Sequence, residues 1–322
     1  MIPVRILGTA SAAPGRVVTT AELATALGRD SQLLEARTGI RTRHWTAPGT
    51  RMAEVGAEVL RRALGTAGLE ARALRRLIFV NSTGGDALIP ATANQIAAAL
   101  GLSGSCDAFD LNNACMGFLS AFDLAARSIA TGWGPVAIVT VELLSRAVAP
   151  DAPRSYLVLG DAAAAVVLGP AREGEGLLGS VLSNNGALPP DTVLAHPLLT
   201  GRPEQVQFHA AREELRRIAL DALASATHAV LAQAQVALGE IEWVLPHQPN
   251  GSMFRSVLEV LGVEPARTVP VVEEIGSVGA AAIPFSLDRL LRTRPVRPGD
   301  RILMTGVGAG VAQGALLYRV GP

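Results

Sequence analysis

The stretch that decides the fold runs from Phe109 to Leu119 and reads Phe-Asp-Leu-Asn-Asn-Ala-Cys-Met-Gly-Phe-Leu. Its polar Asn-Asn pair separates a short strand-like segment from apolar residues that continue at helical spacing through Phe122. We therefore expect a strand to end near the asparagines and a helix to begin after Cys115. A strand that turns directly into a helix is typical of α/β proteins built in layers.

The same alternation extends along the chain, because short β-branched runs bounded by Gly, Asp or Pro alternate with Ala- and Leu-rich stretches. We expect strands at Val4 to Leu7, Leu77 to Asn81, Val136 to Val141, Ala163 to Leu168, Leu177 to Leu182, Trp243 to Leu245, Val269 to Val272 and Arg301 to Thr305. We expect helices at Met52 to Ala67, Pro90 to Leu100, Met116 to Thr131, Arg212 to Leu238, Ser252 to Leu261 and Ala281 to Leu291. The pattern predicts an α/β fold with buried strands.

A weak internal repeat divides the chain. Residues 5–11 resemble residues 176–183, and each half has a strand that runs through a polar turn into a helix, at Cys115 and at His247. A doubled unit implies two similar layers, so we predict an N-terminal half, 1–170, and a C-terminal half, 171–322. The Pro-rich segment from Asn184 to Gln207 has little periodicity, and we expect it to cover a site.

Charge composition excludes several functions. The 322 residues include 28 basic and 28 acidic side chains, and every basic one is Arg. Schiff-base and phosphate-loop lysines are therefore impossible. Balanced charge without a basic cluster argues against nucleic-acid and membrane partners. With only two cysteines and no apolar stretch long enough for a bilayer, we expect a soluble cytoplasmic protein.

Cys115 and His247 are the candidates for chemistry. A thiol at the start of a helix meets unpaired N–H groups and the positive end of the helix dipole, which lower its pKa and suit a nucleophile. His247 stands in a turn at the end of a strand, where α/β sheets place ligand sites. The alternatives are a buried apolar Cys and a structural His. Cys106 is interpreted as structural, and no Cys or His spacing matches a metal site.

The Gly-rich segment from Gly306 to Gly314 follows an expected strand. A dinucleotide motif G-x-G-x-x-G would need Gly where Val311 stands, and the segment lies too near the end of the chain for the unit that carries that motif. We reject nucleotide binding and expect the glycines to permit close backbone approach to another group, such as an acyl carbonyl.

Six stretches, in order, resemble the ketoacyl-acyl-carrier-protein synthase III family of the thiolase superfamily, over essentially the whole chain. They are Ile6 to Leu23, Arg37 to Arg43 (Arg-Thr-Gly-Ile-Arg-Thr-Arg), Asn112 to Phe118, Leu159 to Leu168, His247 to Asn250 (His-Gln-Pro-Asn) and Gly306 to Ala315. The resemblance implies a thiolase-like, five-layer αβαβα fold built from two pseudo-duplicated halves, and a homodimer.

The resemblance also implies roles. Cys115 would take an acyl group from a thioester, and His247 would stabilise an oxyanion or move a proton. The N–H groups of Cys115 and Gly308 would form an oxyanion hole. The contacts it implies with substrate or phosphopantetheine are those of Arg37, Arg154, Asn250, Leu33 and Ile89, and Ile89 would reach the partner's acyl pocket across the dimer.

Two departures from the family bear on the reaction. Ser277 stands where the family has a catalytic Asn, and losing one donor to an enolate oxyanion typically slows such a step by about 10²- to 10³-fold. Leu33 replaces a tryptophan that stacks on the coenzyme A adenine, a contact worth ~1 kcal/mol. The second departure favours a carrier-protein donor over free coenzyme A.

Three hypotheses follow. The leading one is acyl transfer from a carrier-protein or coenzyme A thioester, through acyl-Cys115, to a hydroxyl or amine of a small molecule, and we expect this reaction to belong to secondary metabolism. The alternative is decarboxylative Claisen condensation with malonyl-acyl carrier protein, and the third is a non-catalytic partner subunit. We expect no tightly bound cofactor, because the phosphopantetheine thioester is the substrate. Acyl carrier protein would dock on arginines, of which Arg37, Arg154 and Arg255 are the candidates.

Overall fold

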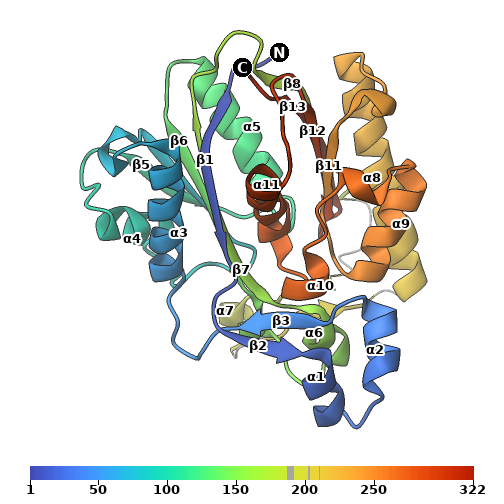
Figure 1. Ribbon diagram of the computed structural model, residues 1–322. Coiled ribbons are helices and arrows are strands. Elements are labelled where there is room, and N and C mark those ends of the chain that lie inside the picture. Colours follow the sequence, from blue (N-terminus) through green and yellow to red (C-terminus); the bar gives the residue numbers. More distant parts are fainter. Residues whose placement is uncertain (187–191, 202–203, 210) are drawn as a thin grey trace.

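The computed structural model describes residues 1–186, 192–201, 204–209 and 211–322. Two main sheets stand side by side, with helices between them and on both outer faces (Figure 1). The first sheet contains, in order, β1 (Arg5–Ala12), β7 (Asp161–Gly169), β6 (Val136–Leu143), β4 (Arg76–Val80) and β5 (Asp107–Leu111). The second contains, in order, β11 (Trp243–Pro246), β12 (Arg301–Gly308), β13 (Ala312–Arg319) and β8 (Gly176–Asn184).

Four strands of each sheet follow one pairing pattern. β4 runs parallel to β6, β6 is antiparallel to β7, and β7 is antiparallel to β1. In the same way β11 runs parallel to β12, β12 is antiparallel to β13, and β13 is antiparallel to β8. Equivalent strands also occur in the same chain order, so the topology carries the duplication that the repeat indicated. The division near residue 170 stays a prediction; it falls in the connection between β7 and β8.

The helices complete five layers (Figure 1). α3 (Met52–Ala67) and α4 (Thr92–Ala99) cover the outer face of the first sheet, and α8 (Arg212–Ala234) and α9 (Gly251–Leu261) cover that of the second. Between the sheets lie α5 (Gly117–Ala130) and α11 (Ala282–Thr293). Because α5 contacts both sheets, its apolar side chains are buried nearly all round. The layers alternate α, β, α, β, α, as predicted.

Short elements gather at one end of the layers. They are β2 (Arg16–Thr19), β3 (Thr42–Trp45), α1 (Thr20–Ala26), α2 (Ser31–Thr38), α6 (Pro153–Val158), α7 (Pro197–Thr200), α10 (Val272–Ile275), β9 (Thr192–Val193) and β10 (Gln207–Phe208). β2 pairs with β3, and β9 pairs with β10. Single 3₁₀ turns occur at η1 (Ala71–Ala73), η2 (Leu144–Ala147), η3 (Leu238–Glu240), η4 (Pro265–Arg267) and η5 (Gly279–Ala281).

The predicted elements are largely present. All six predicted helices form, although α8 ends at Ala234 because Gln235 takes a left-handed conformation with φ 55°. The predicted strand from Val269 to Val272 is wrong, because the N–H groups of Val271 and Val272 donate to the Gln248 side chain and a helix, α10, begins there. β13 was not predicted. No helix among the described residues has the length and apolar character needed to cross a bilayer.

Candidate active site

A cavity of about 610 Å³ opens at the end of the layers where the short elements gather, and it brings most of the predicted residues together. Its lining includes Cys115, His247, Ser277, Gly308, Arg37, Arg154 and Asn250. Three predicted residues do not line it. Leu33 is 57% exposed on α2, Ile89 is 87% exposed, and Arg255 is exposed on α9.

Cys115 is held by a tight turn between β5 and α5. The Asn112 side-chain oxygen accepts the N–H of Ala114 at 3.0 Å, and the Met116 N–H donates to the Asn113 carbonyl at 2.9 Å. Ala114 has φ 45°, a left-handed conformation that costs a non-glycine residue energy. The turn therefore directs the thiol into the cavity one residue after a strained backbone position.

Burial decides the protonation of the two candidate catalytic groups. It raises the pKa of the Cys115 thiol to about 12, with a further contribution from the negative charge of Glu142. The predicted lowering of this pKa is wrong, because α5 begins only at Gly117 and burial outweighs the dipole. Burial also lowers the pKa of His247 to about 4, so the imidazole is neutral near pH 7. A neutral imidazole can accept the thiol proton.

His247 directly follows β11. Its backbone N–H donates to the Thr305 carbonyl at 2.8 Å, which fixes the turn to the neighbouring strand β12. Its ring Nδ1 is buried without a hydrogen-bond partner among the described residues. Asn250 ends the turn and caps α9, because its side-chain oxygen accepts the Met253 N–H at 2.8 Å. Asn250 thus has a structural role beside its place on the cavity wall.

The glycine segment approaches the nucleophile turn closely. A Cβ at Gly308 would lie 3.3 Å from the amide nitrogens of Cys115 and Met116, and a Cβ at Gly306 would lie 3.1 Å from Met116 Sδ. The predicted close backbone approach is therefore present, and the backbone that is approached is that of Cys115. The segment continues into β13 as an antiparallel hairpin, without a helix start.

Ser277 also lines the cavity and is 7% exposed. Its N–H donates to the Val158 carbonyl at 2.7 Å, and its carbonyl accepts the Gly160 N–H at 3.0 Å. Because both backbone groups are paired, the main chain at this position is fixed. A longer side chain would have to extend from the same point.

One acidic residue behind the wall was not singled out from the sequence. Glu142 is fully buried in β6 and accepts hydrogen bonds from the Ser82 hydroxyl at 2.8 Å and the Ala280 N–H at 3.2 Å. Burial raises its pKa to about 7. A carboxylate in an otherwise buried strand, Val136–Leu143, was a signal that the sequence offered.

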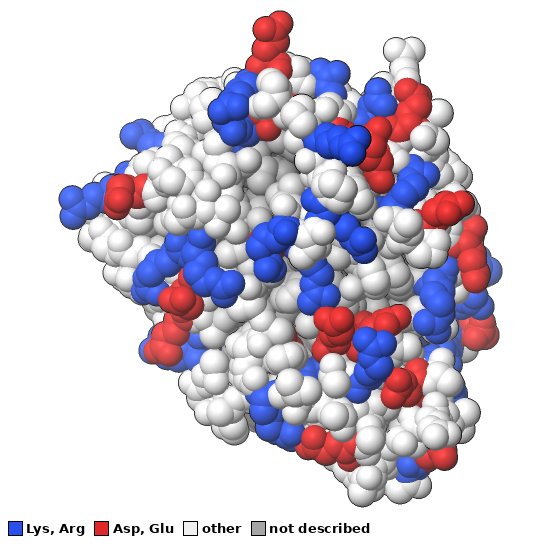
Figure 2. Space-filling model, viewed as in Figure 1, with Lys and Arg blue, Asp and Glu red and all other residues white. Residues whose placement is uncertain are grey.

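Arginines surround the cavity. Arg29, Arg37, Arg154, Arg212 and Arg216 belong to its lining, and no Asp or Glu does among the described residues. Arg29, Arg212 and Arg216 were not predicted, although Arg212 and Arg216 are one helical turn apart at the start of α8. The guanidinium of Arg154 lies 4.4 Å from the ring centre of Phe208. Over the face seen in Figure 2 both signs of charge are interspersed.

The predicted covering segment contributes to the cavity where it is described. Thr192, Leu194, Val206 and Phe208 line it, through the β9 and β10 pair and its flanks. Residues 187–191 and 202–203 of the same segment lie outside the described residues.

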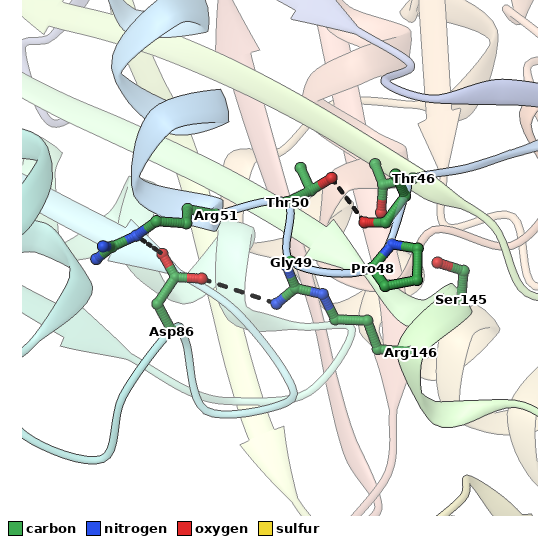
Figure 3. Close-up of a pocket in the computed structure, with 9 residues that line it drawn as sticks. Thr46, Pro48, Gly49, Thr50, Arg51, Asp86, Ser145 and Arg146 are labelled. Carbon is green, nitrogen blue, oxygen red and sulfur yellow. Dashed lines mark hydrogen bonds and ion pairs between the residues drawn. The ribbon is translucent and has the colours of Figure 1, made fainter.

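A second pocket, of about 700 Å³, lies beside the start of α3 (Figure 3). There the Asp86 carboxylate accepts the N–H groups of Met52 and Ala53 and lies between Arg51 and Arg146. This carboxylate is occupied in capping α3, and the pocket contains no Cys or His. The described part of the chain holds no cluster of His, Cys, Asp and Glu suited to a metal ion.

Comparisons with known proteins agree with the fold. The family "3-Oxoacyl-[acyl-carrier-protein (ACP)] synthase III" matches residues 109–186, and its C-terminal counterpart matches residues 231–320. A beta-ketoacyl-[acyl-carrier-protein] synthase III of Symbiobacterium thermophilum is 34% identical over 327 residues, which covers 99% of this chain and 98% of the relative.

Solved structures give the same picture. A 3-oxoacyl-[acyl-carrier-protein] synthase III from Aquifex aeolicus superposes with a TM-score of 0.91 at 27% identity, covering 98% of this chain and 99% of that one. The priming beta-ketosynthase of the R1128 polyketide pathway superposes with a TM-score of 0.88 at 28% identity, covering 99% and 97%. The fold is therefore thiolase-like, and the chain belongs to the 3-oxoacyl-[acyl-carrier-protein] synthase III family of condensing enzymes.

Proposed function

We propose that the protein is a condensing enzyme that extends an acyl group held on Cys115 by decarboxylative Claisen condensation with a malonyl thioester. The observation that carries the proposal is the meeting of Cys115, His247 and the glycine segment in one cavity, in a chain similar over its full length to synthases of that name. These comparisons favour condensation over the acyl transfer to a hydroxyl or amine that the sequence alone had favoured.

In the first half-reaction the Cys115 sulfur attacks the donor thioester carbonyl. The thiol proton passes to the neutral imidazole of His247, the new S–C bond forms, and the donor sulfur leaves with that proton. The negative oxygen of the tetrahedral intermediate would be held by the N–H groups of Cys115 and Gly308. The support for this pair is that the backbone of Gly308 lies close to that of Cys115, so close that a Cβ on Gly308 would be 3.3 Å from the Cys115 nitrogen.

In the second half-reaction a malonyl thioester loses carbon dioxide, and the resulting enolate carbon attacks the acyl-Cys115 carbonyl. The C–S bond to Cys115 then breaks, which releases the 3-oxoacyl thioester, and the leaving sulfur takes a proton from water to restore the thiol. His247 and Ser277, which both line the cavity, are the groups proposed to donate hydrogen bonds to the enolate oxygen. The Ser277 hydroxyl reaches less far than an asparagine amide would from the same fixed backbone. We therefore expect a slow condensation.

Ser277 also favours a second candidate function, acyl transfer to a hydroxyl or amine of a small molecule, in a secondary-metabolite pathway. This reaction forms no enolate, so it does not require the second donor. The neutral His247 would then act as general base toward the acceptor. The third possibility, a non-catalytic subunit, is disfavoured because a purely structural chain has no need for a thiol and an imidazole in one cavity.

The donor is proposed to be a phosphopantetheine thioester, carried by acyl carrier protein or coenzyme A and not tightly bound. The lining arginines, with no acidic residue among the described lining, suit a phosphate. Arg37 and Arg154 line the cavity, so they remain proposed contacts of the phosphopantetheine phosphate, whereas Arg255 lies outside the cavity. A homodimer is proposed from the family resemblance, with the exposed Ile89 and the edge strand β5 at the contact.

The decisive experiment starts from acyl-enzyme prepared with a short acyl thioester and checked by intact mass against Cys115→Ala. Addition of malonyl-carrier protein should release carbon dioxide and a 3-oxoacyl product, and Ser277→Asn should accelerate this step. If the wild-type acyl-enzyme releases no carbon dioxide but loses its acyl group to added alcohols or amines, the second candidate replaces the first. If no Cys115-dependent mass gain occurs with any donor, both are wrong.

A further inference from the structure

Glu142 is a carboxylic acid that no step of the proposed reaction uses. It lies in β6 with no exposed surface, and no ion pair contains it among the described residues. Burying an unpaired carboxylate is unfavourable unless hydrogen bonds compensate it, so its presence near the end of an otherwise apolar strand requires an explanation.

The carboxylate joins two loops of the cavity wall. One oxygen, Oε2, accepts the Ser82 hydroxyl at 2.8 Å, the Ser82 N–H at 3.3 Å and the Asn81 side-chain N–H at 3.3 Å. The other, Oε1, accepts the Ala280 N–H at 3.2 Å, and a Cβ at Gly279 would lie 2.9 Å from it. Ser82 and Gly279 both line the cavity. Glu142 thus lies directly behind the wall and ties the loop after β4 to the loop that carries Ser277.

The electrostatic surroundings of Glu142 are one-sided. Ser82 and Gly279, which lie against its carboxylate, line the same cavity as Cys115, and Leu143, the next residue of β6, pairs with Asp161 of β7. A negative charge on Glu142 disfavours the ionised thiol of Cys115, and the charge of Asp161 disfavours the ionised form of Glu142. From the loop after β4 and from η5 it faces only the uncharged donors Asn81, Ser82 and Ala280. Among the described residues no ion pair offsets its charge, and this charge disfavours ionisation of the Cys115 thiol.

We propose that Glu142 is a positioning residue: its two oxygens hold the loop that bears Ser277, and its negative charge adds to the cost that burial already sets on ionising Cys115 before a thioester is bound. The proposal rests on the proposed role of Cys115 as the nucleophile. Two neighbouring anions in a buried site repel strongly, so Cys115 loses its proton only as His247 accepts it and the sulfur bonds to carbon. The resting enzyme therefore has a thiol that reacts slowly with unspecific electrophiles.

The test measures the alkylation rate of Cys115 by iodoacetamide from pH 5.5 to 9, in wild type and in Glu142→Gln, by peptide mass. Each pKa unit lost by the thiol raises its thiolate fraction tenfold, and the lower nucleophilicity of a less basic thiolate reduces the net gain to about threefold. We expect Glu142→Gln to react at least about threefold faster at pH 8. The two rates should converge below about pH 6, because wild-type Glu142, with its pKa raised to about 7, is then protonated.

Cys106 provides an internal control, because its contacts do not include Glu142 and its rate should be the same in both proteins. Glu142→Asp keeps the charge, so it should keep the slow wild-type alkylation even if the shorter arm loosens the loop. Superimposable Cys115 profiles in wild type and Glu142→Gln, or equal acceleration by Gln and Asp, would overturn the proposal and leave Glu142 a purely structural residue.

Where Glu142→Gln does not fold, Ser82→Ala gives the same information. Removing the 2.8 Å hydrogen bond disfavours the charged form of Glu142, so Cys115 alkylation at pH 7 should accelerate relative to wild type, and the acceleration should fade by pH 9. An unchanged profile in this variant also contradicts the proposal. Alkylation needs no acyl donor, so the two proposals can be told apart. Alkylation rates that do not depend on Glu142 would overturn this proposal even if Cys115 is acylated, and a protein that is not acylated could still show the effect of the Glu142 charge on alkylation.

Discussion

Protonation of His247 should lower the free energy of unfolding of the protein as the pH falls below about 6.5. Its pKa is about 4 in the folded protein and 6.5 as the ordinary value, because burial disfavours the imidazolium. The folded state therefore binds fewer protons than the unfolded state between these values, and stability is lost as pH falls from 6.5 toward 4. Between pH 7.5 and 4.5 the linkage relation gives a loss of about 2.5 kcal/mol from this group.

The perturbation that isolates this contribution is His247→Gln, which has no titrating group in the pH range. Urea unfolding of wild type and variant at closely spaced pH values gives the difference in free energy of unfolding at each pH. We expect wild type minus variant to fall by about 2.5 kcal/mol from pH 7.5 to 4.5, with most of the fall below pH 6.5. Subtraction removes the opposite contribution of Glu142, whose raised pKa gives stability at low pH that is lost as pH rises through about 7.

A matched control is His228→Gln on the exposed face of α8, for which the difference from wild type should stay constant to within about 0.5 kcal/mol across the same range. If the His247→Gln difference is equally flat, the imidazole is not buried in its neutral form. His247 would then not be the neutral base that accepts the Cys115 proton near pH 7.

Three further predictions concern single side chains. Gly308→Ala places a Cβ 3.3 Å from the Cys115 nitrogen, so acylation, followed by intact mass, should slow by about tenfold or more. The free energy of unfolding measured in urea should change by less than about 1 kcal/mol. An unchanged acylation rate would exclude this loop from the oxyanion hole. Gly251→Ala places a Cβ 2.4 Å from the Gly39 carbonyl oxygen, so it should destabilise the protein by about 2 kcal/mol or more. Gly239→Ala is the control, because a Cβ there meets nothing within 4 Å. Equal unfolding midpoints of the two variants would contradict the packing of α2 on α9. Phe208→Ala removes the ring under Arg154, so KM for the donor thioester should rise about fivefold with little change in kcat. A change in kcat alone would instead place Phe208 in the chemical step.

The sequence was sufficient for the features that depend on local periodicity or on a single turn. α3 is predicted to the residue, since its apolar side chains recur at helical spacing and Gly68 ends it in a left-handed conformation. The turn at Cys115 and the turn at His247 were also located, because each follows an apolar strand. Their meeting in one cavity follows from the duplicated topology, which the weak repeat already indicated.

The features that the sequence did not reveal depend on contacts between distant segments. The Val269 to Val272 run is β-branched and reads as a strand, yet the Gln248 side chain takes the N–H groups that a neighbouring strand would need. The high pKa of Cys115 results from burial by several segments and from the charge of Glu142, none of which is local to its turn. Local dipole reasoning therefore gave the wrong direction for the pKa of the nucleophile.

The duplication relates the imidazole and the buried carboxylate to each other through equivalent positions of the two sheets. Val80 of β4 pairs with Thr140 of β6, and Pro246 of β11 pairs with Thr305 of β12, so Asn81 and His247 are the equivalent next residues of the two halves. Asn81 donates to the Glu142 carboxylate, whereas His247 faces the cavity as a neutral base.

By the same register Glu142 corresponds to Val307, an apolar residue of the cavity wall. One half thus has an amide and an acid where the other has a base and an apolar residue. Had the second half kept an acid at position 307, a carboxylate beside His247 would favour the imidazolium and remove the neutral base that the proposed acylation requires. The divergence of these two pairs is therefore what allows a symmetric pair of sheets to build an asymmetric site around one thiol.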